Sequence, residues 1–237
     1  MSENRTPSQT EIQATALLGD APILENEYFR RLEHGTLPKQ GFAHSQAQFS
    51  YAVGFFSRNL ATLIARLPTS AGRAILVHNL AEEHGLDEDN LAAGFRGHLA
   101  HDQTFARFLD SLGVGAEEQL ASIPEAPVTA FNLALLGACG SQAPSFALAA
   151  LGMIEYAFAD ISALIGRRVV ELGWVNADEL VHYSLHAAID KRHAAELFEA
   201  AEAAVLPGEA NTSIASGLDF GRYIFDRLYR DFCKFDS

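Results

Sequence analysis

The stretch from Val181 to Phe198 carries residues whose types and spacing could bind a metal ion. His186, Asp190 and His193 stand at i, i+4 and i+7, so in a helix they project from one stripe. His182 extends this stripe by one turn. An imidazole, a carboxylate and a second imidazole on one face suit a transition metal. A solvated face, on which the aspartate orients two surface histidines, explains the same pattern equally well.

The element that must position these residues is a helix running from about residue 178 to residue 205. Asp178 is a candidate cap at its start. Its apolar side is predicted to consist of four residues: Val181, Leu185, Ala188 and Leu197. His182 would then be an outer-shell or surface residue.

Carboxylates on two other predicted helices could meet this stripe. Glu155 lies in a helix over 145–172 whose first half is almost wholly apolar. Because carboxylates are rarely buried without a partner or a metal, Glu155 is expected to have one. A helix over 70–84 ends in NLAEEHG, which places Glu82 and Glu83 at its negative end. A cation could offset this repulsion, and one of the two acids is expected to point to water.

Acids and histidines on several apolar helices are typical of carboxylate-bridged metal centres in helical bundles. In such bundles an acid and a histidine at i, i+3 recur on facing helices. Asp190-x-x-His193 has this spacing, with aspartate in place of glutamate. Carboxylates that can bridge, together with histidines, favour iron or manganese over a structural zinc site.

Composition limits the class of protein. Of the 237 residues, 49% are hydrophobic, and the net charge is −13. This charge argues against a nucleic-acid footprint and against anionic membrane surfaces. Two cysteines do not make a disulfide framework. The N-terminus is polar, and no run is expected to reach the roughly 18 apolar residues of a membrane span, so we expect a cytoplasmic protein.

Apolar periodicity predicts an all-α fold, a single bundle of seven or eight helices over residues 21–237. Residues 1–20 are predicted to be a flexible lead ending in weak helix. Four aromatic side chains could contact a substrate, although such residues are more often core: Tyr51, Phe55, Tyr156 and Tyr183.

Four segments in order also resemble a known family: NLAEEHG, HDQTFARFLDSLG, GMIEYAFADIS and HAAIDKRHAAELFE. They are similar to the heme-oxygenase-like diiron oxidases and oxygenases. This is the non-heme branch of a fold shared with TenA-type thiaminases and pyrroloquinoline-quinone synthase. The resemblance covers roughly residues 40–200. It implies the heme-oxygenase-like helical bundle as the fold.

The resemblance also implies a function. Two Fe(II) ions, or manganese, would use O2 as co-substrate. They would act on an amino-acid-like or fatty-acid-like small molecule by N-oxygenation, C–C cleavage or desaturation. No nucleic-acid or membrane partner is implied, and a homodimer is one option. The implied ligands are Glu83, His101, Glu155, His186, Asp190 and His193.

One departure from the family concerns the first histidine, which usually lies closer behind the first glutamate. Here residues 84–100 separate Glu83 from His101. His84 points about 100° away from Glu83 on the helix. His98 competes with His101, as Glu82 does with Glu83. If the intervening loop does not fold back, the second metal position is weakened.

Three other functions stay open from the sequence. Heme binding would use an axial histidine, His34 or His44, but leaves the buried acids unexplained. A metal-free TenA-like hydrolase would need a nucleophilic cysteine, for which Cys139 is the candidate. A non-catalytic helical binding protein would use the acids and histidines as a buried polar network.

Overall fold

The helix that carries Glu155 lies at the centre of the molecule. In the computed structural model, α8 (Pro144–Glu171) packs along α9 (Val181–Ala203) and α10 (Thr212–Phe232). Pro144 starts α8 at a position where its missing N–H costs nothing. The structure describes residues 5–86, 92, 94–205 and 212–236.

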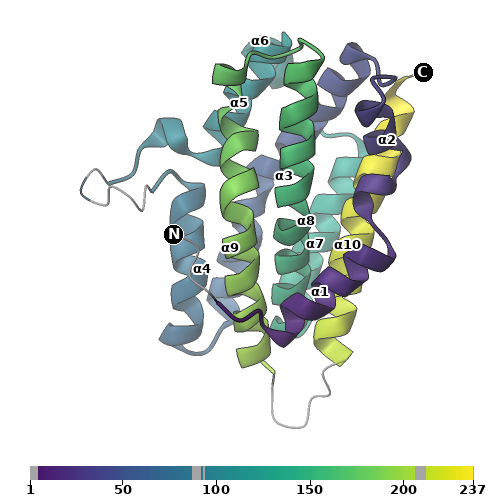
Figure 1. Ribbon diagram of the computed structural model, residues 1–237. Coiled ribbons are helices and arrows are strands. Elements are labelled where there is room, and N and C mark those ends of the chain that lie inside the picture. Colours follow the sequence, from purple (N-terminus) through teal and green to yellow (C-terminus); the bar gives the residue numbers. More distant parts are fainter. Residues whose placement is uncertain (1–4, 87–91, 93, 206–211, 237) are drawn as a thin grey trace.

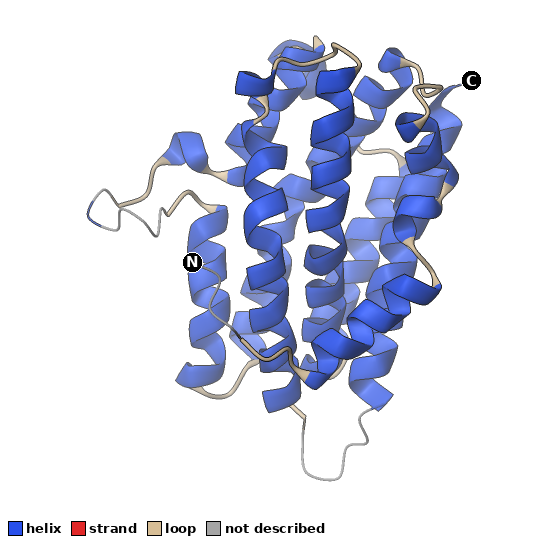
Figure 2. Ribbon diagram, in the orientation of Figure 1, coloured by secondary structure: helices blue, strands red, loops and turns tan. Residues whose placement is uncertain are grey.

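Within those residues the chain forms ten α-helices, with short 3₁₀ turns between them and no strand (Figures 1 and 2). The long helices run side by side, and α1 and α2 cross one face of this bundle (Figure 1). The remaining helices are α1 (Gln9–Asp20), α2 (Glu27–Glu33), α3 (Lys39–Arg66), α4 (Ser70–Glu83), α5 (His101–Leu112), α6 (Ala116–Ala121) and α7 (Ala126–Ser141). The predicted all-α bundle is confirmed.

The N-terminal segment differs from the predicted flexible lead. Ser8 caps α1 by accepting a hydrogen bond from the Glu11 N–H, and α1 packs against α9 and α10. The buried Thr10 N–H donates to Glu202 over 2.7 Å. This segment therefore belongs to the bundle. The sequence did not predict α6. The predicted loop between Glu83 and His101 lies partly outside the described residues.

The buried face of α9 differs from the predicted one at three of its four residues. Val181 is 38% exposed, Ala188 is exposed and Leu185 is half-buried, although Leu197 is buried as expected. The inward face carries what we call the polar stripe: His182, His186, Asp190 and His193. The prediction assumed that the apolar side chains of α9 face the interior of the bundle. In the structure the polar stripe faces inward, where it meets polar side chains of neighbouring helices.

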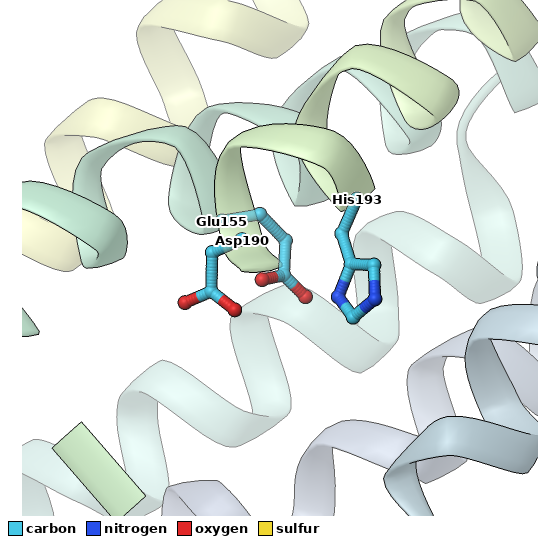
Figure 3. Close-up of side chains that lie close together, drawn as sticks. All are labelled: Glu155, Asp190 and His193. Carbon is cyan, nitrogen blue, oxygen red and sulfur yellow. The ribbon is translucent and has the colours of Figure 1, made fainter. Parts of the chain in front are cut away.

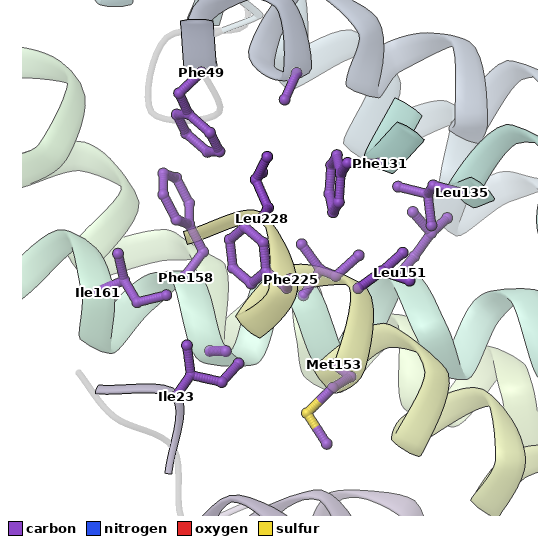
Figure 4. Packing of buried hydrophobic residues seen from close by; sticks show 14 of the residues in the cluster. Ile23, Phe49, Phe131, Leu135, Leu151, Met153, Phe158, Ile161, Phe225 and Leu228 are labelled. Atoms are coloured by element: carbon purple, nitrogen blue, oxygen red, sulfur yellow. The ribbon is translucent and has the colours of Figure 1, made fainter. Parts of the chain in front are cut away.

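Aromatic and aliphatic side chains fill the space around α8 (Figure 4). Phe158 of α8 stacks near Phe49 of α3 and Phe225 of α10. α8 is also long and apolar enough to cross a membrane, contrary to the expectation that no stretch would be. Most of that stretch is buried inside the bundle, which accounts for its apolar composition.

Candidate metal centre

Three donor side chains from α8 and α9 converge inside the bundle. A ligand atom from each of Glu155, Asp190 and His193 lies within 4.8 Å of the others. Asp190 and His193 project from α9 towards Glu155 on α8 (Figure 3). Glu155 is 4% exposed and the other two are fully buried. Three converging donors of these types can hold one transition-metal ion.

His186 lies beside this cluster, one turn before Asp190. Its Nδ1 lies 2.8 Å from Oδ1 of Asp190. Since a carboxylate accepts, His186 donates through Nδ1–H, which leaves Nε2 as a bare lone pair. The ring of His186 lies 4.4 Å, between centroids, from that of His101. It therefore joins the cluster on α9 to the opposite wall of the site.

That opposite wall is the pair Glu83 and His101, which the sequence left unconnected. Oε1 of Glu83 lies 3.0 Å from Nδ1 of His101, and both side chains are almost completely buried. His98, the alternative to His101, is exposed. His84 is exposed as well. Phe95 returns to Leu86 and thereby brings α5 back to the end of α4.

Gly85 makes this return possible. Its φ is +88°, and an antiparallel bridge joins Leu86 to Phe95 directly after it. The Arg96 N–H donates to the Gly85 carbonyl over 2.9 Å. A Cβ at Gly85 would lie 2.3 Å from the Arg96 carbonyl oxygen. Glycine is thus required both for the left-handed backbone and for the close approach of the segment that carries Phe95 and Arg96.

Gly85→Ala is expected to weaken metal binding by displacing His101 from Glu83. The left-handed conformation alone costs about 1–2 kcal/mol, and the clash with backbone adds to it. Gly113→Ala is the matched control, because Gly113 has φ +94° with nothing near its Cβ position. The prediction is contradicted if both variants lose equal stability by thermal unfolding and bind Fe(II) equally well.

Glu82 is buried, contrary to the expectation that one of the two acids points to water. Its Oε2 lies 2.9 Å from Nε2 of His193, and Arg192 donates to its Oε1 over 2.6 Å. Burial opposes ionisation, but these two hydrogen bonds outweigh it and lower the pKa of Glu82 to about 2. Glu82 therefore holds His193 from behind and leaves Nδ1 of His193 free for a metal.

Glu82→Gln is expected to reduce metal affinity about 10–100-fold, as loss of an outer partner of a ligating histidine does. The amide can present its N–H to His193, so the ring loses its preferred orientation. Glu196→Gln is the control, since Glu196 also pairs with Arg192 but does not contact His193. Equal Fe(II) affinities of the two variants in a chelator competition would refute a positioning role for Glu82.

His182 is fully buried, so of its two expected positions, outer-shell and surface, the surface position is wrong. It packs against Phe105, with ring centroids 4.8 Å apart, and against His186 at 4.2 Å. Burial, followed by the neighbouring His186 and His101, lowers the pKa of His182 well below its usual value. The side chain is therefore neutral.

The charges of the metal-free site are set by burial and by pairing. Burial, and then repulsion by Asp190, raises the pKa of Glu155 well above normal. Burial, together with repulsion by Glu83, does the same to the pKa of Asp190. Burial also opposes the ionisation of Glu83 and His101, but each stabilises the charged form of the other. The pKa of Glu83 is accordingly lowered and that of His101 raised. A cation would relieve the repulsion among the acids.

Unpartnered buried atoms test whether these residues fit a metal. A buried polar atom without a hydrogen bond is costly and rare. Four such atoms belong to the site: Nε2 of His182, Nε2 of His186, Oδ2 of Asp190 and Nδ1 of His193. Their concentration here, on residues of ligand type, is what a metal-binding site requires. The donor set fits iron.

A cavity of about 50 Å³ adjoins the centre. Its polar lining consists of Glu83, Glu155 and three histidines, and the rest is apolar. Bulky apolar members of the lining are Phe49, Phe56, Phe131, Ile154, Phe158 and Phe225. The sequence pointed to aromatic residues on the correct helices but not to these side chains, because only packing decides which of them face inward.

The four aromatic residues predicted to contact substrate lie outside the lining of this cavity. The hydroxyl of Tyr51 contacts Ser122, and Phe55 borders a surface groove. Tyr156 contacts Thr15 through its hydroxyl. Tyr183 is buried behind His182 and donates to Gln46. Each of the three hydroxyls has a structural partner.

The residues that heme binding or a metal-free TenA-like hydrolase would need are poorly placed. Burial raises the pKa of Cys139 to about 12, so its thiol is a poor nucleophile. His34 and His44 are exposed and contact the Arg30 carbonyl and Glu125 respectively. Neither histidine lines the cavity beside the metal centre.

Comparison with solved structures shows the same fold. A CADD-like protein of unknown function from Nostoc punctiforme superposes with a TM-score of 0.75 at 18% identity, over 95% of this chain and 96% of that one. A TenA homolog from Pseudomonas syringae gives 0.73 at 16% identity, over 99% and 95%. A domain with a heme oxygenase-like fold from Shewanella denitrificans gives 0.68 at 15%, over 95% and 89%.

Sequence comparison identifies the family. No curated protein gives a significant match to the chain. The family model described as iron-containing redox enzyme matches residues 44–218, which include every candidate metal ligand and the cavity lining up to α10. The resemblance seen in the sequence is thus confirmed: the chain belongs to this family of iron-containing redox enzymes, on a heme oxygenase-like fold.

Proposed function

We propose that the protein is a non-heme diiron oxidase or oxygenase that uses O2 to oxidise a small molecule. The observation that carries this proposal is the cluster of Glu155, Asp190 and His193, buried within 4.8 Å of one another beside an apolar cavity. Membership of an iron-containing redox family supports iron as the metal.

Two groups of residues would hold the two ions. Glu155, Asp190 and His193 form the first group, on the side of α9 that Glu82 supports. The second group is Glu83, His101 and His186, which line the cavity. Glu155 lines the cavity too, so its carboxylate can serve both groups. Bound iron would supply the electrons that reduce O2 while the substrate is oxidised.

The protein's own residues orient these donors and exclude water. His186 and His193 each use one ring nitrogen on a carboxylate, which leaves the other nitrogen directed away from it. Phenyl rings on α3, α7, α8 and α10 keep the cavity apolar. An apolar, enclosed site protects reactive oxygen species from side reactions.

The cavity lining indicates which part of a substrate it accepts. Among the described residues it contains no lysine or arginine, and its cationic histidine, His101, is already paired with Glu83. Its six bulky apolar side chains favour a hydrocarbon or aromatic group next to the centre. A fatty-acid-like substrate, or an amino acid with a large apolar side chain, would meet this requirement by placing its polar end elsewhere.

The proposal is tested by metal content and reaction with O2. Metal-free protein titrated anaerobically with Fe(II) is expected to bind two ions per chain, and admission of O2 should then oxidise the iron with measurable O2 uptake. A chain that binds no Fe(II) at micromolar concentration, or binds it without reacting with O2, is not a diiron oxygenase. In that case the acids and histidines form a structural polar network.

A further inference from the structure

His182 is held by a hydrogen bond that fixes which of its nitrogens carries the proton. The Thr104 hydroxyl lies 2.9 Å from the His101 carbonyl oxygen, which can only accept, so the hydroxyl hydrogen goes there. The same hydroxyl oxygen lies 3.0 Å from Nδ1 of His182. It therefore accepts from Nδ1–H, and Nε2 of His182 is left as a lone pair.

This lone pair is buried and has no hydrogen-bond partner among the described residues. His182 lines the cavity together with Glu83, His101 and His186. The arrangement repeats that of His186 on Asp190 and His193 on Glu82, in which one nitrogen is anchored and the other is bare. In each of the three stripe histidines, one ring nitrogen is therefore held by a hydrogen bond and the other is available to bind a metal.

Three imidazole rings lie next to one another on the cavity side. Ring centroids lie 4.2 Å apart for His182 and His186, 4.4 Å for His101 and His186, and 6.3 Å for His101 and His182. The three rings therefore form one contiguous group on the cavity wall that also carries Glu83.

We propose that His182 is a further metal ligand, which would bind the cavity-side ion together with His101 and His186. With Glu83, this ion would have three imidazoles and a carboxylate. The other position, formed by Glu155, Asp190 and His193, would be richer in carboxylates. Thr104 acts as a positioning residue, because it orients His182 without touching the ion.

The inference rests on the proposed function and adds a seventh donor to it. An ion bound by three imidazoles differs from its neighbour in preferred metal, since imidazole suits iron and other later metals whereas carboxylates suit manganese. We therefore expect the two positions to differ in affinity for Fe(II) and Mn(II).

Two substitutions test the ligand atom and its orientation separately. In His182→Asn, the shorter amide can still donate to Thr104 but has no atom in place of Nε2. Thr104→Val removes the orienting hydroxyl and keeps His182, whereas Thr104→Ser retains it. His98→Asn is the matched control, because His98 is exposed just before α5.

Two readouts are used, neither of which depends on turnover. Fe(II) affinity is measured anaerobically by competition with a chromogenic chelator. Proton NMR of the Co(II)-loaded protein counts coordinated histidines, since each contributes a strongly shifted, exchangeable ring N–H signal. Circular dichroism and thermal unfolding of each metal-free variant establish that it is folded.

His182→Asn is expected to weaken one of the two Fe(II) sites at least about 10-fold and to remove one shifted N–H signal. Thr104→Val should weaken the same site, and Thr104→Ser and His98→Asn should match the wild type. The inference is overturned if His182→Asn keeps both affinities within twofold and every shifted signal. Should His182→Asn not fold, unchanged binding by folded Thr104→Val overturns it instead.

Failure of the proposed function gives a different result. In that case the wild type itself binds no Fe(II) and shows no shifted signals with Co(II). If the wild type binds two ions and reacts with O2 but His182→Asn does the same, only the role of His182 is wrong.

Discussion

Asp190→Asn is expected to lower Fe(II) affinity by more than about 100-fold, because even loss of an outer partner of a ligand costs about 10–100-fold. Asp190 combines full burial, an unpartnered Oδ2 and a place in the three-donor cluster. Glu155→Gln is expected to behave in the same way. Anaerobic titration with Fe(II) and O2 uptake measure both effects.

Asp190→Asn should also stabilise the metal-free protein at neutral pH. Burial raises the pKa of Asp190, so the folded chain holds a proton that the unfolded chain releases above about pH 4. More protons bound in the folded state mean that stability falls as pH rises through this window up to the raised pKa. Asparagine carries no charge, so the variant loses this dependence. Urea unfolding with chelator at several pH values measures it.

Asp160→Asn provides the control for both measurements. Asp160 lies on α8 as Glu155 does, but it is exposed and pairs with Lys191 over 3.0 Å. Its replacement should leave iron binding and the pH dependence of stability unchanged. If Asp190→Asn also bound iron as the wild type does, or destabilised the metal-free protein at neutral pH, Asp190 would be a structural residue.

Gly221→Ala is expected to destabilise the fold by about 3 kcal/mol or more, the upper end for overpacking, because rigid backbone blocks the added methyl. A Cβ on Gly221 would lie 2.4 Å from the carbonyl oxygen of Ala150 on α8. Gly217, one turn earlier, would place its Cβ 2.3 Å from the Phe146 carbonyl. α10 and α8 thus pack backbone against backbone, and any methyl at this seam drives them apart.

Thermal and denaturant unfolding measure this effect, and Gly137→Ala is the control. Gly137 is exposed within α7 with nothing near its Cβ position, so alanine should stabilise the protein by up to about 1 kcal/mol. Because Ala150 lies little more than one turn before Glu155, Gly221→Ala should also weaken iron binding. Equal stabilities of the two variants would show that the α8–α10 seam can open without cost.

Local patterns in the sequence were sufficient to predict the fold class and to single out several residues of the candidate metal centre. Helical periodicity predicted the bundle, and the fold and the family are now established. The spacing of His186, Asp190 and His193 required only that the segment be helical, because residues at i, i+4 and i+7 share a stripe in any helix. Glu155 stood out because an acid within an apolar helix needs a partner.

Tertiary structure decided that the polar stripe of α9 points inward, whereas Val181 and Ala188 of the predicted apolar side are exposed. Periodicity states which residues share a stripe, but the direction of that stripe depends on what the neighbouring helices present. The return of His101 to Glu83 depended on a bend at Gly85 and a bridge whose geometry no helix pattern encodes. The burial of Glu82 and His182 depended on partners 111 and 78 residues away in the chain, His193 and Thr104. Contacts over such separations arise from packing of the whole bundle, so the sequence supplied the donors and the fold decided how they meet.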